Sequence, residues 1–221
     1  MSEAAALYRR LGAEFIGTFA LVFAGAGAIV IDTRQHGAIT HVGIAATFGL
    51  VIMVMIYAVG HISGGHFNPG VTLAFATARH FPRHHVLPYW AAQFTAAIAA
   101  ALALRAMFGD VAHLGATRPS GSDMQSFWLE MILTFGLMFV IVSVATDTRA
   151  VGQAAAIAIG GTVGLEAMFA GPISGASMNT ARSLGPALAA ADFHSFWVYA
   201  IAPPIGAVLG ALAYQAIRGD S

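Results

Sequence analysis

Long apolar stretches of about one membrane thickness dominate the chain. A helix needs about 20 apolar residues to cross the hydrocarbon core of a bilayer, and six stretches of that length alternate with short polar connections. This pattern predicts an all-α membrane protein with six transmembrane helices. The predicted spans cover residues 11–31, 42–59, 86–105, 126–146, 150–170 and 195–217.

Two shorter apolar segments, 69–79 and 180–190, lie between these spans. Each is about half a span long and follows a phrase of the form Gly-x-Ile-Ser-Gly-x-x-x-Asn, which begins at Gly60 in one copy and at Gly171 in the other. Half-length segments at matching positions of two halves indicate a functional site near the bilayer midplane. We therefore expect two re-entrant half-helices.

The repeated phrase belongs to a duplication along the whole chain. The hexapeptide EFIGTF, which begins at Glu14, matches EMILTF, which begins at Glu130. Each half holds three spans, and an odd number of spans turns the second half upside down relative to the first. The sequence therefore predicts a single domain over residues 1–221, built from inverted repeats at about 8–110 and 122–218.

Composition supports a lipid environment and excludes several other partners. Hydrophobic residues make up 58% of the chain and charged residues only 9%, whereas a soluble domain carries about 25% charged residues. The absence of cysteine removes disulfides and thiolate metal ligands. No basic patch suggests nucleic acid.

The arginines predict the orientation in the membrane. Six spans place both termini on the same side, and an excess of arginine marks the cytoplasmic side. We therefore expect both termini to be cytoplasmic. The cytoplasmic set is Arg9, Arg10, Arg79, Arg83, Arg149 and Arg218, against Arg34, Arg118 and Arg182 on the other side.

An asparagine ends each copy of the phrase and precedes each half-helix. Asn68 and Asn179 suit the N-cap position, where the side-chain oxygen accepts backbone N–H groups, and their NH2 groups would be left to donate outward. Inverted symmetry brings both positive helix ends to one place, and such ends exclude protons and cations. The alternative is that both asparagines are only caps, but their doubling favours a pore for neutral hydrogen-bonding solutes.

These motifs resemble the aquaporin, or major intrinsic protein, family, and most closely its nodulin-26-like branch and the bacterial aquaglyceroporin-type members. The matching phrases are AEFIGTF, GHISGGHFNP and GPISGASMN. The resemblance implies six tilted helices with two half-helices, a homotetramer with one pore per subunit, and a bacterial inner (plasma) membrane. It places Asn68, Pro69, Gly70, Asn179, Thr180 and Ala181 at the central constriction, and the carbonyls of Gly64, Gly65, His66, Phe67, Ala176, Ser177 and Met178 along the path.

The resemblance also implies a selectivity filter of Phe48, Ala167, Ala176 and Arg182. Water-selective members of the family resemble Phe, His, a small residue and Arg at these positions. Here alanine replaces the histidine, which widens the gap and removes a donor. We therefore expect passage of water, glycerol and uncharged metalloid acids (arsenite, antimonite and boric acid). An intramembrane arginine must face water or a partner, and a structural bond to loop carbonyls is a compatible second role for Arg182.

Three other functions remain open at this stage. One is a narrower, water-selective channel of the same fold. Another is a proton-coupled transporter in which Glu14 and Glu130 relay protons, although we favour both acids as loop anchors because buried polar groups must be paired. An intramembrane hydrolase needs a nucleophile with a base in reach, and neither Ser63 nor Ser174 has an evident one. We expect no enzyme activity and no cofactor.

Several remaining polar residues carry weaker expectations. His61 precedes the first loop and is a candidate cytoplasmic gate, since histidine titrates near neutral pH. His80, His84 and His85 predict a solvated basic loop in preference to a metal site, because no acid or cysteine accompanies them in the sequence. Glu166 is expected to brace the outer loop, and the alternative is that it lines the pore.

The two phrases end differently from the family's usual Asn-Pro-Ala. Gly70 replaces the alanine and is expected to loosen the contact between the half-helices, and Thr180 replaces a proline. Neither change removes an asparagine or Arg182, so we expect conduction and proton exclusion to survive. The spacing of Gly206 and Gly210 is a close-packing motif, which serves either within one subunit or between subunits.

Overall fold

A computed structural model describes residues 3–146 and 154–218, and every regular element in these ranges is helical. Two short 3₁₀ helices, η1 (Arg83–His85) and η2 (Ala112–Gly115), lie in the connections. The α-helices are α1 (Glu3–Arg34), α2 (Thr40–Ser63), α3 (Pro69–Thr77), α4 (Val86–Phe108), α5 (Asp123–Thr146), α6 (Ala155–Ser174), α7 (Thr180–Ala189) and α8 (Phe196–Ile217).

The structure confirms the all-α membrane fold that the sequence predicts. The six longer helices are long and apolar enough to cross a bilayer, and each coincides with one predicted span. The half-helices α3 and α7 begin at the predicted residues, Pro69 and Thr180, and end within two residues of the predicted ends. Arg149 and the first residues of the fifth predicted span, 150–153, lie outside the described residues.

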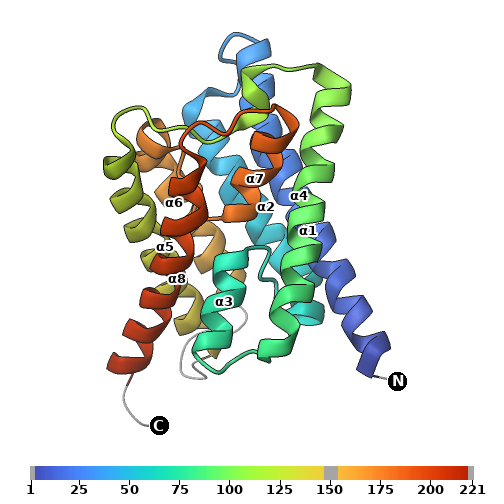
Figure 1. Cartoon of the computed structure of the whole chain (residues 1–221), viewed down its shortest axis with the longest axis vertical. Coiled ribbons are helices and arrows are strands. Elements are labelled where there is room, and N and C mark those ends of the chain that lie inside the picture. The colour runs from blue at the N-terminus through green and yellow to red at the C-terminus, as the bar shows by residue number, and fades with distance from the viewer. Residues whose placement is uncertain (1–2, 147–153, 219–221) are drawn as a thin grey trace.

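The half-helices approach the middle of the molecule from opposite ends. Figure 1 shows α3 near the end where α1 begins and α8 ends, and α7 near the other end. Each half-helix packs against the last long helix of the opposite half: α3 lies on α8, and α7 lies on α4. The two halves of the chain therefore interlock.

Glycines allow the long helices to approach closely. A Cβ added at Gly206 would lie 2.2 Å from the backbone oxygen of Met131, and one at Gly210 would lie 2.3 Å from that of Phe135. The close-packing motif of α8 therefore faces α5 within the same chain, which decides the alternative that the sequence left open.

Candidate functional site

The two asparagines cap the half-helices and also bind each other's loops. Asn68 Oδ1 accepts the backbone N–H of Gly70 at 2.8 Å, and Asn179 Oδ1 accepts that of Ala181 at 3.0 Å. This confirms the predicted N-caps. The sequence suggested that their NH2 groups are free to donate outward, but each group already makes one hydrogen bond within the protein. Asn68 Nδ2 donates to the Met178 oxygen at 2.7 Å, and Asn179 Nδ2 donates to the Phe67 oxygen at 2.8 Å.

An amide NH2 carries two hydrogens, and the bond to the opposite loop uses one of them in each asparagine. The second hydrogen of each remains to donate to a solute. The bonds across the junction also fix the two helix ends against one another, so that the positive ends of both dipoles point at the same region.

Buried carboxylates hold both loops, and their predicted hydrogen bonds to the loop backbone are present. Glu14 accepts the backbone N–H groups of His66 at 2.9 Å and Phe67 at 2.7 Å. Glu130 accepts those of Ser177 at 2.9 Å and Met178 at 2.8 Å. Both glutamates are fully buried, and every one of their oxygens accepts at least one bond. These contacts hold the loop backbone at Phe67 and Met178 in its strained left-handed conformation, with φ of 49° and 53°.

Side chains that the sequence analysis did not single out complete the support. Tyr89 of α4 donates its hydroxyl to the Ser63 oxygen at 2.8 Å, and Tyr199 of α8 donates to the Ser174 oxygen at 2.6 Å. The tyrosines are 199 − 89 = 110 residues apart, close to the repeat distance, so the duplication was a usable signal. Gln93 has no such counterpart, and it donates to Glu14 at 2.9 Å.

A cavity of about 590 Å³ runs from the C-terminal end of α2 to Arg182 and passes both asparagines. Its walls are mostly apolar. His61 lines it, whereas four residues of the predicted central constriction do not: Pro69, Gly70, Thr180 and Ala181. All of the residues predicted for the carbonyl path do: Gly64, Gly65, His66, Phe67, Ala176, Ser177 and Met178.

Two residues of the predicted filter are in contact. The Arg182 Cζ lies 5.0 Å from the centroid of the Phe48 ring, and Arg182 Nη1 donates to the Gly115 oxygen at 2.8 Å. Arg182 thus has a structural partner and also lines the cavity, as do Phe48 and Ala176. Phe48 itself packs on α1, where a Cβ at Gly25 would lie 2.1 Å from its ring.

Ala167, the fourth filter residue, is 7% exposed and is not among the residues that line this cavity. It does continue a lining face of α6. Ile159 and Val163 line the cavity, and residues four apart share a face of a helix. Ala167 is therefore the next residue of that face toward the outer end.

The structure corrects one expectation about the end of the first loop and one about Glu166. A Cβ at Gly70 would meet Asn68 at 3.2 Å and Pro203 and Pro204 of α8 at 3.5 Å, so Gly70 faces α8 and does not loosen the contact with α7. Thr180 also faces α8, with Oγ1 donating to the Tyr199 oxygen at 3.0 Å.

Glu166 does not brace the outer loop. Its carboxylate points toward α5, where a Cβ at Gly136 would lie 2.9 Å from Oε1. Among the described residues, Oε2 has no hydrogen-bond partner. Sequence position alone suggested the loop because Glu166 stands near the outer end of its span, but the side chain packs between helices.

Comparison with known proteins agrees with this geometry. The family model for the major intrinsic protein matches residues 1–214. Aquaporin NIP1-1 of Oryza sativa subsp. japonica is 56% identical over 211 residues, which cover 95% of this chain and 74% of the relative. Nodulin-26 of Glycine max is 48% identical over 211 residues, which cover 95% and 78%.

A solved structure, the aquaglyceroporin from Plasmodium falciparum, superposes with a TM-score of 0.84 at 24% identity, over 96% of each chain. This likeness supports the fold. The named sequence relatives are plant proteins, so the expectation of a bacterial membrane has no support from them.

The interlocked halves, the facing asparagines and the cavity between the loops define a multi-pass membrane channel. The chain belongs to the major intrinsic protein family, the family of the aquaporins.

Proposed function

We propose that the chain is a passive channel for water and for small uncharged solutes, such as glycerol and the metalloid acids arsenite, antimonite and boric acid. The cavity that reaches both asparagines and Arg182 carries this proposal. Loop carbonyls and amide hydrogens offer a solute hydrogen bonds, and the apolar walls accept its carbon edge. The two helix ends repel cations and protons.

The small side chain of Ala167 supports the wider solute range over water alone. Ala167 stands on the lining face of α6, and it adds only a methyl group where a larger side chain would narrow the path. A solute with several hydroxyls therefore has room beside Phe48 and Arg182. The alternative is a water-selective channel, for which the filter itself must be too narrow for glycerol.

Replacement of Ala167 tests the filter. Ala167→His should keep water flux and lower glycerol and arsenite flux by tenfold or more, because the imidazole fills the gap. Ala167→Ser adds a hydroxyl with little added volume, so its glycerol flux should equal that of the native chain. Swelling of proteoliposomes measures both. Equal glycerol flux in the histidine variant and the native chain would show that Ala167 is outside the filter.

The proton-coupled alternative gains little from the surroundings of Glu14 and Glu130. Each carboxylate oxygen accepts a bond from a loop backbone, a serine or Gln93, which is the arrangement of an anchor. Uptake that collapses on addition of an uncoupler would nevertheless establish coupling.

The proposal includes the orientation, assembly and gating that the sequence suggested. Both termini are cytoplasmic, the subunits form a homotetramer with one pore each, and His61 acts as a gate at the cytoplasmic mouth. Native mass spectrometry tests the tetramer. Water flux that stays flat between pH 5 and 8 would remove the gate.

A further inference from the structure

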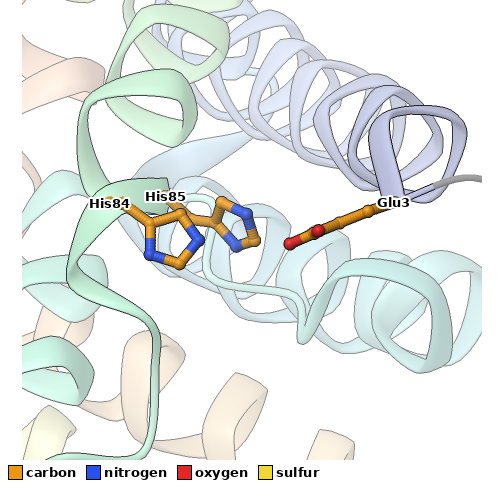
Figure 2. Close-up of side chains that lie close together, drawn as sticks. All are labelled: Glu3, His84 and His85. Carbon is orange, nitrogen blue, oxygen red and sulfur yellow. The ribbon is translucent and has the colours of Figure 1, made fainter.

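Three side chains that could each offer a ligand atom to a metal ion meet at the end that carries the termini. Glu3 belongs to the first turn of α1, while His84 and His85 belong to η1, between α3 and α4. One ligand atom of each lies within 4.8 Å of the other two. Figure 2 shows the Glu3 carboxylate and the His84 ring on either side of a ring nitrogen of His85. Glu3, distant in the sequence, therefore supplies the acid that the sequence around these histidines lacks.

The surroundings of His85 give a second observation, independent of the distances within the cluster. His85 is only 8% exposed, and its Nδ1 has no hydrogen-bond partner within residues 3–146 and 154–218. Buried side-chain nitrogens are nearly always paired. The ring also packs against a neighbour outside the cluster, because its centroid lies 6.0 Å from that of Phe81. His85 thus offers a positioned and unused nitrogen.

We propose that Glu3, His84 and His85 form a binding site for a divalent transition-metal ion of the zinc type. Two imidazoles and one carboxylate are a ligand set that zinc accepts, with water in the fourth position. Two imidazole ligands also make the site a poor one for magnesium and calcium, because these ions prefer oxygen ligands. Tetrahedral ligands at about 2.05 Å from zinc stand about 3.3 Å apart. Glu3 and His84 are exposed, so rotation of their side chains can close the remaining gap around the fixed His85.

A bound ion would tie the first turn of α1 to the connection between the half-helix α3 and α4. That connection contacts the channel: the Phe81 ring lies 4.9 Å from the ring of His66, which lines the cavity. The site therefore anchors an end of the chain beside the inner mouth. The inference concerns residues outside the pore and holds whether or not the proposed solutes pass.

Zinc binding to the full chain, free of any histidine tag, tests the site by equilibrium dialysis in detergent micelles. We expect one tightly bound ion per chain. His85→Gln and, separately, Glu3→Gln should weaken binding by tenfold or more. His80→Gln, a nearby histidine outside the cluster, should bind as the native chain does. Zinc should also slow amide hydrogen exchange in the first turns of α1 in the native chain and not in either ligand variant.

Water flux measured without zinc shows that each variant is folded, and the exposed Glu3 serves if His85→Gln does not fold. Zinc-edge X-ray absorption should show nitrogen or oxygen ligands at about 2.0–2.2 Å with the scattering pattern of imidazole. Equal affinity and stoichiometry in the native chain and both ligand variants would mean ordinary surface binding by other histidines, and would overturn the proposal.

Discussion

Thr180, at the start of α7, shows how a single residue can compensate for another far along the chain. Pro203 inside α8 has no N–H, so the Tyr199 oxygen four residues earlier loses its helical partner. The Thr180 hydroxyl donates to that oxygen. A proline at position 180, as the family usually has, would supply no such donor. The departure from the family phrase therefore satisfies a buried carbonyl of α8.

Thr180→Val should lower the free energy of unfolding by about 1–3 kcal/mol, because the shape is kept while a buried carbonyl is left unpaired. Thr95→Val is the control: Thr95 is exposed and bonds only within its own helix, so its loss should stay within about 0.5 kcal/mol. Denaturant titration in micelles measures both. Equal effects would show that the bond to α8 contributes no stability. Proton exclusion should persist in each variant.

Replacing Glu14 and, separately, Glu166 by glutamine compares an acid that anchors a loop with one that does not. Each carboxylate oxygen of Glu14 accepts two hydrogen bonds, and the donors are Ser63, His66, Phe67 and Gln93. In Glu14→Gln an NH2 group replaces one of these oxygens. Donor then faces donor, and we expect poor folding and water flux reduced by tenfold or more. The Oε2 of Glu166 has no hydrogen-bond partner in the described part of the chain, so Glu166→Gln should keep normal folding and normal water flux. Stopped-flow water flux per folded chain decides; normal flux in Glu14→Gln would contradict the anchor role.

The connection between α7 and α8 should lose stability in acid. Burial opposes the ionisation of Asp192, but hydrogen bonds from the His194 N–H and from Arg118, at 3.2 and 2.6 Å, together with the charge of Arg118, lower its pKa below the ordinary 3.8. Its contribution is therefore complete above about pH 4 and is lost as the pH falls through the lowered pKa.

Because Arg118 is partly exposed, Asp192→Asn should cost about 1 kcal/mol or less, seen as a lower melting temperature at pH 6. The difference from the native chain should shrink toward pH 3. A difference that is independent of pH would assign the effect to shape instead of charge.

At the scale of the helices, contact between α5 and α8 depends on the absence of side chains. Gly206→Ala would place a Cβ 2.2 Å from the Met131 oxygen, and α5 and α8 would have to separate. We expect a loss of about 1–3 kcal/mol. Gly161→Ala in α6 has no atom within 4 Å of the new Cβ, so it should not lower stability and should raise it by up to about 1 kcal/mol, because alanine suits a helix interior better than glycine. Thermal unfolding in micelles compares them, and similar melting points would contradict this packing.

The sequence predicted the elements better than it predicted their contacts. Apolar length specified the spans, and the asparagine at the end of each phrase specified where α3 and α7 begin, because both signals are local. Contacts between distant segments leave no such local signal. Gly70 faces α8, Glu166 faces α5, and Glu3 meets His85 only because the helices pack as they do.

At the scale of the whole molecule, neither half forms the channel alone. Asn68 bonds to the second loop and Asn179 to the first, and each half-helix rests on a long helix of the other half. The cavity takes its polar lining from both loops. Duplication and inversion could be counted in the sequence, but the cross-bonding of the asparagines required the structure.

Stopped-flow light scattering on proteoliposomes, with water, glycerol and arsenite in parallel, tests the central claim most directly. If the chain is a passive channel for these solutes, all three should cross faster than in protein-free liposomes, in proportion to their gradients and without effect of an uncoupler. Vesicles that pass water but neither glycerol nor arsenite, or uptake that stops with the uncoupler, would contradict it.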